Sequence, residues 1–137
     1  MERIVVGFDG SEHARKALQR AADISDGATV AVVSAANVSS FMRDPAGGVA
    51  AVDPADAEAR ASALKEAREY LEGRGINGVY VEGHGRPADV IVEEAKESGA
   101  DLIVVGTRGH GAVTQLFMGS VSTNVVHHAP CDVLIVR

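Results

Sequence analysis

Asp101-Leu-Ile-Val-Val105, followed by Gly106-Thr-Arg-Gly-His-Gly-Ala-Val-Thr-Gln-Leu-Phe-Met-Gly-Ser120, is the stretch that decides the fold of this chain. Its first part is a short apolar run of the kind that a parallel sheet buries on both faces. The glycines that follow permit positive φ and let backbone N–H groups approach an anion without a Cβ in the way. Gly119 and Ser120 stand where a helix is expected to begin, and unpaired amides at a helix start attract phosphate. The stretch therefore predicts a strand, a glycine-rich loop that could bind an anion, and a helix, in that order.

The rest of the chain alternates apolar runs with helical periods. Further strands are expected at Arg3–Phe8, Thr29–Ala36, Val79–Glu82 and Asp132–Val136. Helices are expected after the capping residue Ser11, from about Ala55 to Glu72, from Pro87 to near Gly99, and over Ser120–His127. This alternation predicts one α/β domain over residues 1–137, with an open, mostly parallel, five-stranded sheet and helices on both faces.

Two segments are less regular in their pattern. Residues 37–54 are rich in Gly, Ala and Pro and have neither period, so they are expected to form a mobile connection. The helix from Ala55 to Glu72 is rich in alanine, and its inward face is predicted to carry Ala57, Ala61, Leu64 and Leu71.

Charge and composition exclude several classes of function. A net charge of −6 argues against a broad surface for DNA or RNA, so any anion site must be local. The sequence has neither an apolar run long enough to span a bilayer nor a signal-peptide pattern, so a cytoplasmic protein without a membrane partner is expected. Cys131 is the only cysteine and is interpreted as a small buried hydrophobic residue.

General motifs leave the glycine-rich segment open. Its G-x-x-G-x-G spacing is not the Rossmann pattern, and no glycine is followed by Lys and Ser/Thr as in a P-loop. A surface loop with tight turns explains the glycines as well as a phosphate cradle does. The role of Asp9 in the turn Asp9-Gly10-Ser11 after the first strand is also undecided from these motifs. Its carboxylate could accept a hydrogen bond from the backbone of its own turn, or it could contact a ligand. If the first and fourth strands are neighbours, both turns open into one crevice.

The full spacing Gly106-x2-Gly109-x9-Gly119-Ser120 resembles the nucleotide-binding signature of the universal stress protein family. Other features agree with it along the whole chain: Val5-x-x-x-Asp9-Gly-Ser11, Gly85-x-Pro87, Asp101-Leu-Ile-Val-Val-Gly106 and Pro130-Cys-Asp-Val-Leu-Ile-Val136. The sequence departs from the family at Asp132, where relatives often carry a second proline.

This resemblance implies the strand order 3-2-1-4-5 and the branch of the family that binds ATP or a related adenine nucleotide, possibly with Mg²⁺. Asp9 would contact the adenine or the ribose, and the backbone at Ala35 would meet the adenine edge. The other residues expected in the binding site are Gly7, Gly106, Arg108, Gly109, Gly119, Ser120 and Val121.

The absence of a recognisable base or catalytic lysine favours a regulatory binding module with slow or no turnover. An ATP hydrolase or nucleotide-activating enzyme at the same site remains an alternative, as does a cyclic-nucleotide sensor. None of the five histidines has the spacing of a metal site. The apolar run Asp132–Val136 is expected to be an edge strand, which predicts a homodimer through it.

Overall fold

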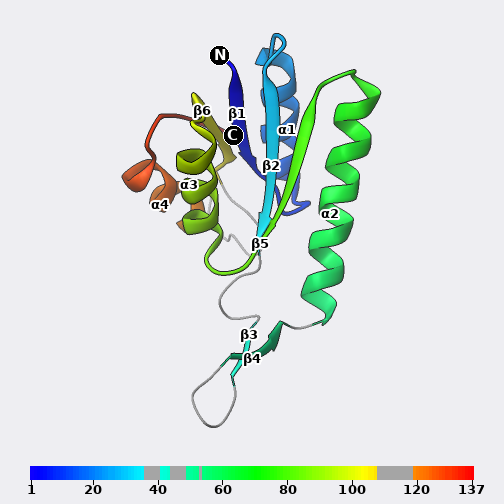
Figure 1. The fold of residues 1–137 in the computed structure, drawn as a ribbon, viewed down its shortest axis with the longest axis vertical. Helices are drawn as coiled ribbons and strands as arrows, with labels where there is room; N and C mark the ends of the chain where they lie inside the picture. The colour runs from blue at the N-terminus through cyan, green and yellow to red at the C-terminus, as the bar shows by residue number, and fades with distance from the viewer. Residues whose placement is uncertain (36–40, 44–48, 53, 108–118) are drawn as a thin grey trace.

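A computed structural model describes residues 1–35, 41–43, 49–52, 54–107 and 119–137 of the chain. Five strands form one parallel sheet in the order β5-β2-β1-β6-β7 (Figure 1). Their bounds are β1 (Arg3–Gly7), β2 (Thr29–Ala35), β5 (Gly78–Gly83), β6 (Leu102–Gly106) and β7 (Asp132–Val136). Counted within this sheet, the order is the 3-2-1-4-5 arrangement that the family resemblance implies, so the predicted fold is confirmed.

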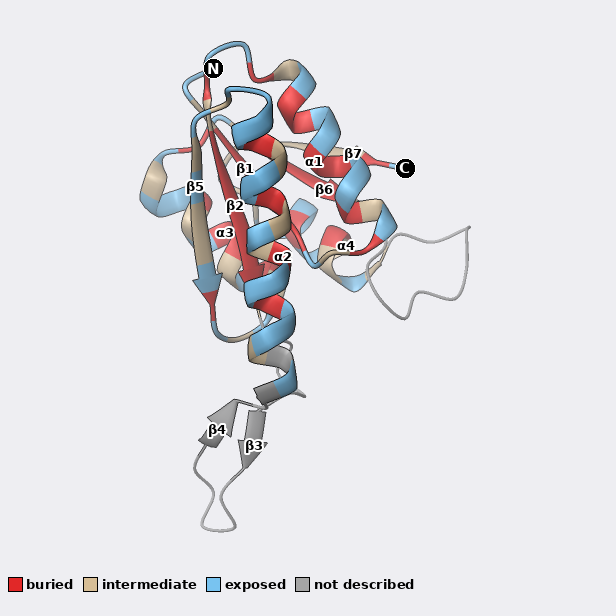
Figure 2. Cartoon of the chain, turned by 90° about the vertical axis from the view of Figure 1, so that its right-hand side faces the viewer, coloured by how far each residue is buried: buried red, intermediate tan, exposed pale blue. Residues whose placement is uncertain are grey.

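Helices cover both faces of the sheet (Figures 1 and 2). The helices are α1 (Glu12–Ile24), α2 (Pro54–Gly73), α3 (Pro87–Ser98) and α4 (Ser120–His128). Alternate residues of each buried strand face opposite layers: Ile4 and Val6 pack in the core that contains α1 and α2, and Val5 packs in the core that contains α3 and α4. The strands therefore read as continuous apolar runs because both of their faces are covered.

Local sequence signals explain where the helices begin and end. Ser11 caps α1, its Oγ accepting a hydrogen bond from the backbone N–H of Ala14 at 3.2 Å. Pro87 stands in the first turn of α3, where no backbone donor is needed. Gly99 ends that helix in the left-handed region, at φ 64°.

The connection expected over residues 37–54 contains a short hairpin. Strands β3 (Phe41–Arg43) and β4 (Val49–Val52) pair with each other in antiparallel fashion, outside the main sheet. The sequence pattern did not predict these two strands. Strands of three and four residues are too short to show an alternating pattern in the sequence.

The inward face of α2 also differs from the predicted one. Of the predicted residues, Leu71 is buried and Leu64 packs against the core, but Ala61 is exposed. Arg60, Ala63 and Ala67, which were not predicted, are buried. The Arg60 guanidinium bonds the Glu82 carboxylate of β5, with Nη2 at 3.2 Å and Nε at 3.3 Å. A buried arginine thus ties the start of α2 to the end of β5.

Asp101 joins the beginnings of β1 and β6. Its Oδ2 accepts hydrogen bonds from the backbone N–H groups of Glu2 at 2.7 Å and Arg3 at 3.0 Å. These two bonds favour the ionised carboxylate and lower the pKa of Asp101 below its ordinary value.

We expect Asp101→Asn to lower the free energy of unfolding at neutral pH. Because the folded-state pKa is depressed, the carboxylate's contribution is present above the unfolded pKa and is lost as pH falls through the folded one. The stability gap between wild type and variant should therefore shrink as the pH is lowered through the acid range. Urea unfolding at a series of pH values measures the gap. A gap that stays constant with pH would contradict this role.

Candidate functional site

The carboxyl ends of β1, β2 and β6 lie side by side at one edge of the sheet. Gly7 ends β1 and pairs with Val33 of β2, and β1 pairs with β6 on its other side. The turns after β1 and β6 therefore open at the same edge, as the sequence predicted if these strands were neighbours. The winding of the chain reverses between β1 and β6, which is where open α/β sheets bind their ligands.

The turn after β1 is organised by its own side chains. Asp9 Oδ1 accepts a hydrogen bond from the Ser11 N–H at 2.9 Å, and Gly10 adopts φ +82°. The interpretation of Asp9 as a turn-forming residue is thus confirmed for one of its oxygens. Asp9 is nevertheless exposed, and an ionised carboxylate has lone pairs for more than one donor. The structure leaves Asp9 compatible with a second role towards a ligand.

The Thr107 carbonyl joins the end of β6 to the start of α4. It accepts hydrogen bonds from the Gly119 N–H at 2.5 Å and from the Ser122 hydroxyl at 3.1 Å. The Thr107 N–H in turn donates to Val136 O of β7 at 2.9 Å. The Gly119 amide is thereby engaged by the protein itself. It is not one of the donors that could face a phosphate, although Gly119 was placed in the predicted site.

Helix α4 begins at the sheet's carboxyl edge without a side-chain cap. Its N-cap residue is Gly119, at φ −68° and ψ 165°, which offers no capping oxygen. The amides of Ser120 and Val121 belong to the first turn, where an α-helix has no intrahelical acceptors. Ser120 is exposed and Val121 is half-buried, and the Ser120 hydroxyl lies in the same turn. Two amides, one hydroxyl and the positive end of the helix dipole are the features with which helix starts attract anions.

Two glycines that were predicted to line the ligand lie where a neighbouring helix leaves no room for a side chain. A Cβ on Gly106 would lie 2.8 Å from the His13 carbonyl oxygen in the first turn of α1. A Cβ on Gly7 would lie 2.6 Å from Ile91 Cδ1 of α3. Both glycines allow a helix to approach the sheet closely, a requirement that their sequence context did not reveal.

The remaining residues of the predicted site are Ala35, Arg108 and Gly109. Ala35 is the last residue of β2, half-buried, and pairs with Gly83 of β5. It therefore lies at the same edge as Asp9 and Ser120. Arg108 and Gly109 lie outside the described residues.

Metal-binding or thiol chemistry finds no support in the described ranges of the chain. They contain no group of three or more His, Cys, Asp or Glu side chains that could hold a metal ion. Burial, and then the nearby Asp132 carboxylate, raise the pKa of the half-buried Cys131 thiol, which disfavours the reactive thiolate. No helix in this part of the protein has the length and apolar character needed to cross a membrane.

Sequence comparison connects this geometry to known proteins. The chain matches the universal stress protein family over residues 1–137. It is 40% identical to a universal stress protein of Thermus aquaticus, in an alignment covering 98% of this chain and 97% of that one. It is also 34% identical to one of Methanocaldococcus jannaschii, over 99% of this chain and 82% of that one.

Solved structures give the same result. A universal stress protein from Archaeoglobus fulgidus superposes with a TM-score of 0.79 at 25% identity, covering 100% of this chain and 99% of that one. An Archaeoglobus fulgidus structure in complex with dAMP has a TM-score of 0.76 at 26% identity, covering 100% and 98% of the two chains. A universal stress protein in complex with cAMP has a TM-score of 0.77 at 29% identity, covering 99% and 97%. The chain belongs to the universal stress protein family.

Proposed function

We propose that this protein binds ATP at the carboxyl edge of its sheet and acts as a regulatory module with slow or no turnover. The observation that carries the proposal is the uncapped start of α4, where the Ser120 and Val121 amides and the Ser120 hydroxyl lie at the same edge of the sheet as the turn after β1. The complexes of two family members with dAMP and cAMP support an adenine nucleotide as the ligand class.

In this proposal the nucleotide lies across the edge of the sheet, from the end of β2 to the end of β6. Neighbouring strands lie about 4.8 Å apart, so the end of β2 and the end of β6 are separated by about 10 Å across β1. A base beside Ala35 and phosphates at Ser120 span such a distance, with the sugar between them near Asp9. A carboxylate suits the sugar or base, where it accepts hydrogen bonds, and not the phosphates. In this proposal Arg108 and Gly109 complete the phosphate side, and any Mg²⁺ arrives with the phosphates.

A thermal unfolding scan with a panel of ATP, AMP, cyclic AMP and GTP tests the proposal. At about 100 times its dissociation constant, ATP should stabilise the fold by roughly 2.7 kcal/mol. That corresponds to a rise of several degrees in Tm for a domain of this size. GTP serves as the control for general phosphate binding. A folded sample whose Tm is unchanged by all three adenine nucleotides would rule the function out.

A cyclic-nucleotide sensor is the second candidate, favoured by the family member whose structure holds cAMP. Competition binding separates the two, because a cyclic-nucleotide sensor should prefer cyclic AMP over ATP. Single-turnover assays with ATP and Mg²⁺ address the enzymatic alternative. Rapid hydrolysis that Ser120→Ala abolishes would replace the binding module with a hydrolase.

We also propose a homodimer through β7. Among the strands that the structure describes, β7 ends the sheet and pairs only with β6, so none of them lies along its outer edge. Its residues Val133, Leu134 and Ile135 are only half-buried in the single chain. Pairing with a second copy would cover this edge. Sedimentation at micromolar concentration should give the mass of a dimer, and the mass of a single chain would contradict the proposal.

A further inference from the structure

The opposite edge of the sheet is also open. Of the strands in the described residues, β5 pairs with β2 alone, and the Val30 N–H donates to the Asn77 carbonyl at 2.9 Å. Backbone groups alternate in direction along a strand, so those of Val79 and Val81 also face β2. The N–H and C=O groups of Gly78, Tyr80 and Glu82 consequently face outward. Within the described ranges, these outward groups show no hydrogen-bond partner.

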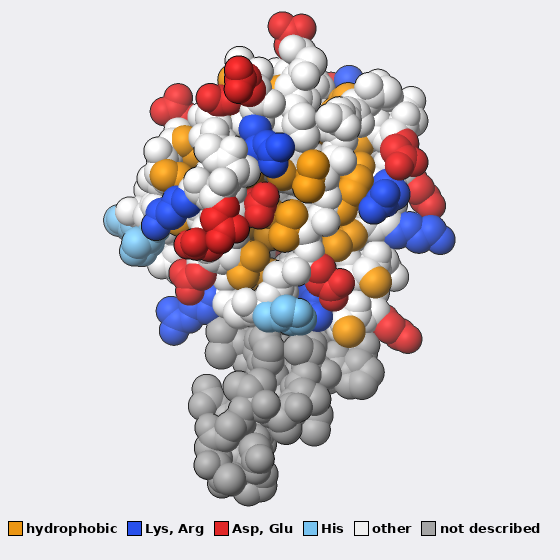
Figure 3. Space-filling model, viewed as in Figure 1, with side chains coloured by type: hydrophobic (Ala, Val, Ile, Leu, Met, Phe, Trp, Pro, Cys, Tyr) orange, Lys and Arg blue, Asp and Glu red, His pale blue; other side chains and the backbone are white. Residues whose placement is uncertain are grey.

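A groove runs between this edge and α3. It measures about 470 Å³, with Val81 and Val90 forming its apolar part. Four carboxylates from α3 line it, those of Asp89, Glu93, Glu94 and Glu97, and His84 and Arg86 line it just before that helix, so carboxylates outnumber basic side chains. Figure 3 shows acidic side chains gathered beside a strip of hydrophobic side chains on this face. In the described part of the protein none of these four carboxylates forms an ion pair.

The other side of β5 has a different charge. The Arg68 guanidinium lies over the Tyr80 ring, 4.4 Å from its centroid, and Arg60 pairs with Glu82. Arginines from α2 therefore already occupy the face on which Tyr80 and Glu82 project. A strand added to this edge would meet carboxylates on the α3 side and guanidinium groups on the α2 side.

We propose that the β5 edge and the acidic groove bind an extended basic segment of a partner protein by strand addition. The segment carries Lys or Arg at alternate positions, directed towards Glu93 and Glu97, and uncharged residues between them. Backbone hydrogen bonds to the outward groups hold it, and the charge pattern selects it. This interaction is separate from the proposed nucleotide site, so occupancy of one does not presuppose the other.

A second copy of this chain fits the edge poorly. The β5 sequence Gly78-Val-Tyr-Val-Glu-Gly83 contains no basic residue and has one carboxylate of its own. Pairing two β5 edges would bring two sets of α3 carboxylates together, and like charges facing each other across an interface disfavour binding. Charge complementarity thus favours a basic partner.

The test uses a short end-capped peptide of alternating Lys and Val, and a second peptide of the same composition with the Lys residues in one block. Amide hydrogen exchange by NMR reports on each residue of β5. The alternating peptide should protect the amides of Tyr80 and Glu82 but leave Val79 and Val81 unchanged, because these already bond β2. Equal binding of the block peptide, or no binding of either, would overturn the proposal.

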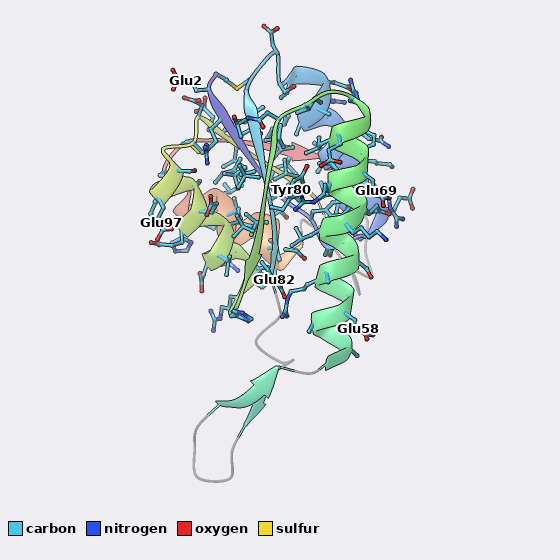
Figure 4. The ribbon with its side chains drawn as sticks, turned by 45° about the vertical axis from the view of Figure 1, so that its right-hand side comes forward. Glu2, Glu58, Glu69, Tyr80, Glu82 and Glu97 are labelled. Carbon is cyan, nitrogen blue, oxygen red and sulfur yellow. The ribbon has the colours of Figure 1, made fainter. Side chains whose placement is uncertain are left out.

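Charge reversal gives the matched variants. Glu93→Lys with Glu97→Lys should weaken binding of the alternating peptide by about tenfold or more. The control is Glu58→Lys with Glu69→Lys, at two exposed positions of α2 (Figure 4). It changes the net charge by the same amount as the first double variant and should have little effect on peptide binding. If both double variants lost affinity for the peptide equally, binding would depend only on the net charge of the protein, and the proposed site would be wrong. A protein that has the mass of a dimer, and whose outward β5 amides are protected before any peptide is added, would contradict the proposal. The edge would then bind a second copy of the chain.

Discussion

Ser120→Pro is expected to weaken ATP binding at least about a hundredfold while the protein stays folded. Proline removes both the N–H and the hydroxyl that residue 120 offers to a phosphate. The helix itself does not need that N–H, because Ser120 is the first residue of α4. Gly119, at φ −68° and ψ 165°, already has the extended conformation that a following proline favours. Calorimetric titration with ATP measures the loss of affinity.

Ser120→Ala is the matched control, since it removes only the hydroxyl. It should weaken ATP binding by about tenfold, the effect of one hydrogen bond to a charged group. The difference between the two variants then isolates the backbone amide. Thermal unfolding without ligand should give a similar Tm for wild type and both variants. Wild-type affinity in Ser120→Pro would place the phosphates elsewhere on the molecule.

The sequence predicted the main sheet and its four helices because their signals are local. Apolar runs such as Asp101–Val105, the capping residue Ser11 and the terminating residue Gly99 act within a few residues of their own position. The strand order came from the resemblance to the family. Periodicity identifies strands but contains nothing about which strand lies beside which.

The errors concern contacts between distant segments. In the alanine-rich α2, small residues stand on several faces, so the pattern did not distinguish exposed Ala61 from buried Ala63. The burial of Arg60 depends on Glu82 in another element, which no local signal reveals. At the candidate site, the residue pattern correctly predicted the helix start at Ser120, but the bond from the Gly119 amide to the Thr107 carbonyl was visible only in the structure.

Gly106→Ala is expected to have the largest effect on stability among simple substitutions near the site. The new Cβ would lie 2.8 Å from the His13 carbonyl oxygen and 2.9 Å from its carbonyl carbon, both backbone atoms of α1. Relief of this overlap requires the helix to move away from β6, and overpacking of this kind costs about 3 kcal/mol. A fall in Tm of about ten degrees should follow. Chemical unfolding in urea measures the free-energy change directly.

Gly7→Ala is the matched control on the other face of the sheet. There the nearest atom is Ile91 Cδ1 at 2.6 Å, the end of a flexible side chain that can turn aside. Its cost should be about 1 kcal/mol, clearly less than that of Gly106→Ala. The pair thus separates two explanations for the first glycine of the signature. If Gly106→Ala were as stable as wild type and lost only ATP binding, Gly106 would serve the ligand directly; a large loss of stability instead assigns it to the packing of α1 against β6.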